Sequence, residues 1–98
     1  MFNTPGGNST ATAAADGDPI TCSTTVATLI PQNRERKGGV IYNGTGGNLY
    51  VRFAAGATTI LFSYLLASGD HLELPGGYCG IVTGIMSAGS GPAYVTEF

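Results

Sequence analysis

Few residues in this sequence are of the types that catalyse reactions or bind metal ions. His71 is the one histidine, and it directly follows Asp70. Adjacent residues of a strand point to opposite faces of a sheet, so this pair is badly placed for a catalytic dyad. Asp70, His71 and Glu73 lack the spacing of a zinc site, and Asp-Gly-Asp at 16–18 does not match a calcium-binding loop. We therefore expect no enzyme activity, no catalytic residue, no metal site and no cofactor.

Glycine-rich stretches at 44–47, 76–77 and 89–91 are a second place to look for chemistry, because glycine loops can hold phosphate groups. None of them leads into the Gly-Lys-Ser/Thr of a phosphate-binding loop, or into a helix whose N-terminus would bind an anion. We interpret these glycines as turn residues.

The two cysteines, Cys22 and Cys79, lie far apart and do not have the spacing of a metal site. They form either two free thiols or one disulfide, and we expect free thiols. No apolar run of about 18 residues is long enough to cross a membrane. The first four residues also lack the basic and apolar regions of a signal peptide. We expect cytoplasmic synthesis and no membrane partner.

Charge is scarce. Charged residues make up 10% of the 98 residues, against a usual value of ~25%, and the net charge is −2. Weak charge repulsion favours association in water. Arg34, Arg36 and Lys37 are three of the four basic residues, but Glu35 interrupts them, so there is no basic stripe for a phosphate backbone and we expect no nucleic-acid partner. We interpret the cluster as a solvated loop, with an acidic patch on a partner protein as the alternative.

The first part of the chain, residues 1–19, differs in composition from the rest. It consists mainly of Gly, Asn, Ser, Thr and Ala, with one aromatic residue, Phe2, and shows no strand or helix periodicity. Such a segment buries too little apolar surface to fold alone. We predict an extended N-terminal arm over 1–19, held by contact with another chain, and a folded domain over 20–98.

The remainder reads as short strands separated by turns, with β-branched and aromatic residues in the strands and glycine between them. The Asn-Gly pair at 43–44 predicts a hairpin between 39–42 and 48–53. We predict an all-β fold, a small antiparallel β-sandwich or barrel. The other expected strands are 20–30, 58–66 with both faces covered, 71–74, 78–86 and 93–98.

Tyrosine is the residue type best suited to an interface here, because it has an apolar body and a polar tip. Tyr42 and Tyr50 flank one loop and are candidates to face a partner chain or a sugar ring. The segment 93–95 and Phe98 have the character of an apolar edge strand that must be hidden, which predicts self-association near the C-terminus. The candidate interface residues are Phe2, Arg34, Arg36, Lys37, Tyr42, Tyr50 and Phe98.

Two stretches carry a resemblance: RKGGVIYNGTGGNLYVRF at 36–53 and LASGDHLELPGGYCGIVTGIMSA at 66–88. In their pattern of strand and turn residues they resemble small β-rich virion proteins of tailed bacteriophages, of the capsid decoration or cement type. The resemblance implies a protein that binds the outside of an icosahedral head, often as a trimer or dimer, and clamps neighbouring major capsid subunits. It implies no cofactor, and it identifies no contact residue.

With this resemblance, we expect a structural virion protein, made in the host cytoplasm and located on the capsid surface, with the major capsid protein and copies of itself as partners. Two alternatives remain open. One is a carbohydrate- or receptor-binding β-module of a phage tail or fibre, using an exposed tyrosine patch. The other is a tail or head–tail connector component.

Overall fold

The computed structural model describes residues 15–16 and 19–98. Most of the predicted arm at 1–19, including the candidate contact residue Phe2, lies outside the described residues. Within it, β2 (Ala15–Asp16) pairs with the C-terminal strand of the same chain, β10 (Gly91–Glu97).

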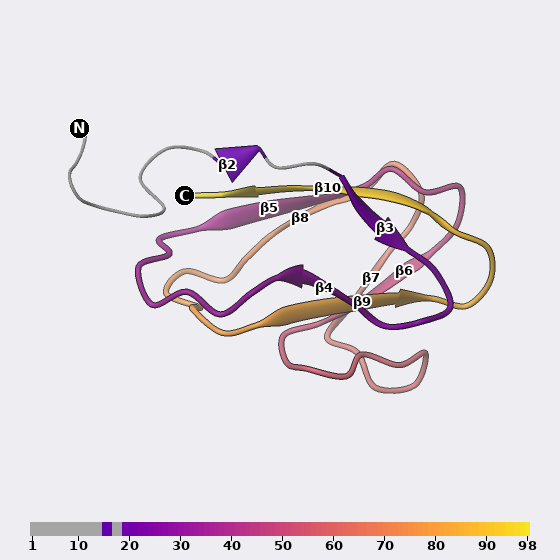
Figure 1. Ribbon diagram of the computed structural model, residues 1–98, viewed down its shortest axis with the longest axis horizontal. Coiled ribbons are helices and arrows are strands. Elements are labelled where there is room, and N and C mark those ends of the chain that lie inside the picture. Colours follow the sequence, from indigo (N-terminus) through magenta and orange to yellow (C-terminus); the bar gives the residue numbers. More distant parts are fainter. Residues whose placement is uncertain (1–14, 17–18) are drawn as a thin grey trace.

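The described residues form two antiparallel sheets packed as a sandwich, as the sequence predicted (Figure 1). One sheet, sheet I, contains β2, β3 (Ile20–Cys22), β10, β5 (Gly39–Asn43) and β8 (His71–Glu73). The other, sheet II, has the order β4 (Ala27–Ile30), β9 (Val82–Met86), β6 (Leu49–Arg52) and β7 (Tyr64–Leu66). No helix long and apolar enough to cross a membrane occurs in the described part of the chain.

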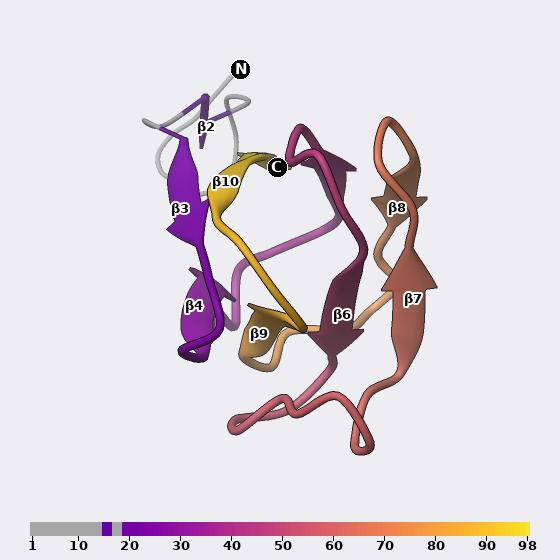
Figure 2. The same cartoon turned by 90° about the vertical axis from the view of Figure 1, so that its right-hand side faces the viewer.

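The strand pairing shows how the sandwich is wound. The pairs β3–β10, β4–β9, β5–β8 and β6–β7 together make one long antiparallel ribbon that turns back between β6 and β7. The ribbon is rolled so that β10 also pairs with β5 and β9 also pairs with β6. This strand order is that of an eight-stranded jelly roll. Every connection between consecutive strands from β3 to β10 passes from one sheet to the other, except β6–β7, whose two strands are paired in sheet II (Figure 2).

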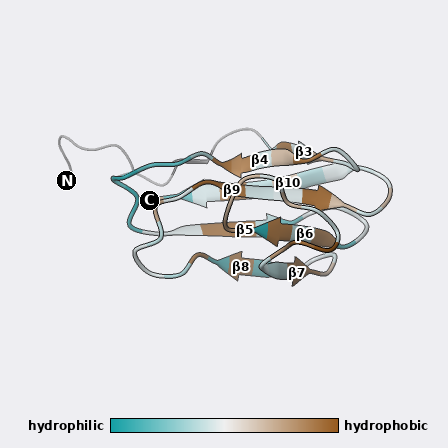
Figure 3. Ribbon diagram, turned by 90° about the horizontal axis from the view of Figure 1, so that it is seen from below, coloured by the Kyte–Doolittle hydropathy of each residue, from teal (hydrophilic) through white to brown (hydrophobic). Residues whose placement is uncertain are grey.

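The core lies between the two sheets, because inward and outward residues alternate along the strands. In β5 the burial alternates, with Ile41 fully buried and Tyr42 exposed. Figure 3 shows hydrophobic segments on β4 and β5. The buried cluster consists of Cys22, Leu29, Ile30, Ile41, Leu49, Val51, Leu66, Leu72, Leu74, Val82, Met86 and Ala93.

The predicted hairpin around 43–44 is wrong. Its two strands, β5 and β6, belong to different sheets, and the loop between them crosses the sandwich. A two-residue Asn-Gly hairpin requires positive φ at the turn, and Gly44 is not among the glycines with positive φ. Asn43 is instead buried and holds the crossing loop, because its Nδ2 donates to Gly47 O and Leu66 O, both at 2.9 Å, and its Oδ1 accepts from Thr45 N.

Four other strand predictions need correction. The expected strand 20–30 is divided by a turn into β3 and β4, which lie in different sheets. The expected strands 58–66 and 78–86 are strand only at β7 and β9. The C-terminal strand is not an edge strand, because β10 has β5 on one side and both β3 and β2 on the other.

Candidate interaction surfaces

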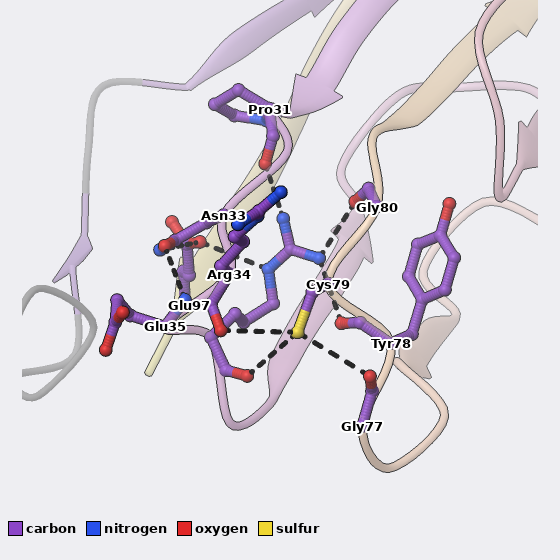
Figure 4. Close-up of polar contacts among 10 residues, drawn as sticks. Pro31, Asn33, Arg34, Glu35, Gly77, Tyr78, Cys79, Gly80 and Glu97 are labelled. Atoms are coloured by element: carbon purple, nitrogen blue, oxygen red, sulfur yellow. Dashed lines mark hydrogen bonds and ion pairs between the residues drawn. The ribbon is translucent and has the colours of Figure 1, made fainter.

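Arg36 is the centre of a polar cluster, and Figure 4 shows its labelled partners Pro31, Tyr78, Gly80 and Glu97. Its guanidinium donates from Nε to Glu97 Oε2 at 3.1 Å and from Nη1 to Tyr78 O and Gly80 O, and Nη2 donates to Pro31 O. The Arg36 side chain is fully buried. The solvated-loop interpretation is therefore wrong for Arg36, because its side chain is buried and its hydrogen-bond partners belong to the same chain.

The same cluster joins three segments that are far apart in the sequence. Asn33 Nδ2 donates to Glu97 Oε2 at 2.9 Å, and Asn33 N donates to Cys79 O at 2.9 Å. These bonds tie the β4–β5 loop, the β8–β9 loop and the end of β10 together. We refer to them as the Arg36 lock. Arg34 and Lys37, its neighbours in sequence, are exposed.

Both cysteines are free thiols, as expected. Cys22 is buried in the core, and loss of solvation there raises the pKa of its thiol. Cys79 is partly buried beside the Arg36 lock, with Sγ 3.6 Å from the carbonyl oxygens of Arg34, Arg36 and Gly77.

The outer face of sheet I carries exposed aromatic side chains. The register places Tyr94, Tyr42 and His71 opposite one another across β10, β5 and β8. Tyr42 and Tyr94 are 42% and 48% exposed, and their ring centroids are 6.0 Å apart. The next outward row across the same strands is Thr96, Val40 and Glu73. We define the aromatic face as Val40, Tyr42, His71, Glu73, Tyr94 and Phe98.

Two glycines let aromatic rings lie close against the backbone of this face. A Cβ atom on Gly44 would be 2.5 Å from Cε2 of Tyr94, and one on Gly38 would be 2.6 Å from Cε2 of Phe98. Phe98 is further fixed through its backbone, since its N–H donates to Gly38 O at 3.0 Å and its carbonyl accepts from Lys37 N at 2.7 Å. The two rings therefore rest on the two ends of β5.

At the Phe98 end the aromatic face borders a shallow depression of ≈ 340 Å³. Lys37, Glu73 and Phe98 are among its lining residues. The structure thus brings three of the seven predicted interface residues, Lys37, Tyr42 and Phe98, to one side of the molecule.

Tyr50 belongs elsewhere. It lies on β6 of sheet II, is partly buried, and meets Phe62 edge to face with ring centroids 5.0 Å apart. Tyr42 and Tyr50 therefore cannot share one flat partner surface, although they flank the same loop. Tyr94 and His71, which are absent from the seven candidate interface residues, are the side chains that accompany Tyr42. The available signal was strand parity, since residues 94, 96 and 98 alternate with inward positions.

A second apolar surface lies on the β6–β7 loop and on β7. We define the apolar strip as Ile60, Leu61, Phe62, Tyr64 and Leu65, which are 86%, 53%, 40%, 49% and 44% exposed. The expectation that both faces of 58–66 are covered is wrong, because these side chains project from the edge of sheet II and Leu66 alone among the large side chains of 60–66 is buried.

The loop that carries the apolar strip is held by hydrogen bonds. Thr58 N donates to Leu61 O at 3.0 Å, and Thr58 Oγ1 accepts from the N–H groups of Ile60 and Leu61 at 3.2 and 2.8 Å. The start of the loop is tied to β9, since Ala57 N donates to Thr83 Oγ1 at 3.1 Å. The strip is thus presented by an ordered turn.

No group of three or more His, Cys, Asp or Glu side chains that could hold a metal ion occurs within residues 15–16 and 19–98. In comparisons with known proteins, no family model matches the chain, and neither a curated protein nor a solved structure matches it significantly.

Proposed function

We propose that the chain is a structural virion protein of the capsid decoration type, which binds the outer surface of a phage head and stabilises neighbouring major capsid subunits. The sequence resemblance supports this role. The jelly-roll topology agrees with it, because that fold is common among viral capsid proteins, although it also occurs in lectins and enzymes and does not determine function by itself.

The observation that carries the proposal is the aromatic face. Tyrosine is enriched at protein interfaces because its ring buries apolar area while its hydroxyl finds a polar partner. Tyr42 and Tyr94 stand on the two central, fully paired strands of sheet I, with Tyr94 resting against Gly44. A surface that is already rigid loses little conformational entropy on binding, which favours affinity.

The scarcity of charge predicts the character of the contact. Apart from the tyrosines, the described ionisable side chains on or beside the aromatic face include Lys37, His71 and Glu73. Binding therefore rests on apolar burial and hydrogen bonds, and its affinity should change little with ionic strength.

The same face supports a second candidate, a carbohydrate-binding module of a phage tail. Exposed aromatic rings on a flat sheet can stack against sugar rings, and His71 and Glu73 lie on the adjacent strand to accept or donate hydrogen bonds. In this case the ligand is a saccharide, and the module is scarce in the particle.

The deciding experiment is a quantitative mass-spectrometric census of the native virion. A head-coating protein should approach the copy number of the major capsid protein. A copy number of a few per particle would contradict the decoration role and favour the tail module. Rebinding of purified protein to particles that lack it then gives the affinity for the head surface.

A further inference from the structure

The four lateral edges of the two sheets are not equally protected against pairing with another chain. An edge strand presents unpaired backbone N–H and C=O groups, and proteins usually blunt it with charge, proline or a bulge. The β8 edge has two exposed polar or charged side chains, His71 and Glu73. The β4 edge has a register shift between Thr28 and Ile30, and Pro31 follows it.

The third edge lies beside β10, where the edge of sheet I is divided between the short strands β2 and β3, and Pro19 precedes β3. On the remaining edge, β7 is also short, but its residues Tyr64, Leu65 and Leu66 include no charge, no proline and no bulge. β7 ends the order of sheet II, so its outer side has no strand partner among the described residues.

We propose that the β7 edge and the apolar strip form a self-association surface, with a second copy of this chain as the occupant. The two β7 strands would pair antiparallel across a two-fold axis near Leu65 and join two copies of sheet II into one continuous sheet. A two-fold contact is self-complementary. When residue i of one copy meets residue j of the other, residue j of the first copy also meets residue i of the second.

The charge pattern favours a second copy over a different partner. In a two-fold contact any charge near the axis faces its own copy, and like charges directly opposite each other are destabilising. No charged residue occurs between Arg52 and Asp70, a stretch that contains the whole strip. The aromatic face, in contrast, includes Glu73 and borders Lys37. This inference is independent of the virion role, because it concerns the protein alone in solution.

The side chains of the apolar strip are already held in place in the single chain. Phe62 packs on Tyr50, and Thr58 fixes the turn that exposes Ile60 and Leu61. Burying side chains that are already ordered costs less conformational entropy than ordering a mobile loop on binding.

The test is sedimentation velocity of the purified full chain over a concentration series, with Leu65→Lys and a matched control, Val26→Lys. Val26 is 42% exposed, close to the 44% of Leu65, and lies in the β3–β4 turn outside the strip. We expect a concentration-dependent dimer for the wild-type chain and for Val26→Lys. For Leu65→Lys we expect a dissociation constant raised at least about 10-fold, because two lysines face each other across the axis.

Mixing provides the control for misfolding. Leu65→Lys and Leu65→Glu should each be impaired alone, and an equimolar mixture should regain dimers, because opposite charges then face each other. A wild-type chain that stays monomeric at every concentration would overturn the proposal. So would a dimer that Leu65→Lys leaves intact, or failure of the mixture to regain dimers. If the chain is monomeric and Leu65→Lys abolishes binding to particles, the strip contacts the head instead of a second copy. If the dimer behaves as expected but the protein does not bind heads, only the proposed function fails.

Discussion

The aromatic face and the apolar strip both expose large side chains, but they differ in how the chain supports them. The aromatic face lies mainly on β5 and β10, the central strands of sheet I, and Tyr94 and Phe98 rest on Gly44 and Gly38, which flank β5. The apolar strip lies on an edge strand and on the loop before it, and it has no charged residue. An exposed patch with mixed chemistry on paired strands suits a different partner, whereas a neutral patch on an unprotected edge suits a second copy.

The largest expected effect comes from the Arg36 lock, which supports the end of the aromatic face and does not contact the strip. Arg36→Met leaves Glu97 and three carbonyl oxygens without their guanidinium partner. We expect a loss of about 3 kcal/mol in the free energy of unfolding, measured by urea denaturation. The control is the exposed neighbour Arg34→Met, which should change stability by less than about 0.5 kcal/mol. Equal stability of the two variants would show that the lock does not hold the fold.

The next effect concerns affinity for particles. The double substitution Tyr42→Ala and Tyr94→Ala removes the pair of exposed rings while leaving β7 untouched. We expect occupancy on particles that lack the native protein to require at least about 10-fold more protein, since interface tyrosines often contribute more than 1 kcal/mol each. Self-association should remain at the wild-type level, and so should particle binding by the control Val26→Ala. Loss of dimers in the tyrosine variant would show that the aromatic face also takes part in self-association.

A smaller effect is expected where a single methyl group displaces a ring. In Gly44→Ala the new Cβ lies 2.5 Å from Cε2 of Tyr94, so the ring must move. We expect a loss of about 1 kcal/mol in stability and a several-fold loss in particle affinity. Gly46→Ala, in the same loop, is the control, because nothing lies within 4 Å of its Cβ position. Calorimetry of both variants checks the comparison, and identical behaviour would mean that the fit of Tyr94 against β5 is unimportant.

The smallest effect on folding is expected on the strip. Ile60 is 86% exposed, so Ile60→Ser should change the free energy of unfolding by less than about 0.5 kcal/mol. Its self-association should nevertheless weaken, which sedimentation equilibrium would show. A large loss of stability would mean that Ile60 packs inside the monomer.

The all-β fold was predictable from this sequence, but the pairing of the strands was not. β-branched residues and glycine turns indicated the all-β sandwich, and the alternation around Ile41 and Leu72 matches their burial. Asn43-Gly44 misled because a hairpin and a crossing loop begin with the same residue types. The buried Asn43 side chain decides between them by bonding to Leu66 O, a partner far away in sequence.

The candidate surfaces were predictable only in part, for the same reason. Arg36 looked solvated because its neighbours are charged, but its partners Tyr78 O and Gly80 O come from a distant loop. The run 58–66 looked covered because it is apolar on both parities. Its position at a sheet edge depends on the rolling of the whole ribbon, which no local pattern encodes.

Hydroxyl-radical footprinting of side chains tests most directly whether the two surfaces have separate partners. The full chain is labelled at low concentration, at a concentration that forms dimers, and bound to particles. Raising the concentration should protect Ile60, Leu61 and Phe62 and leave Tyr42 and Tyr94 reactive. Binding to particles should then protect the two tyrosines. Protection of Tyr42 and Tyr94 on concentration alone, or protection of the strip only on particles, would contradict the account.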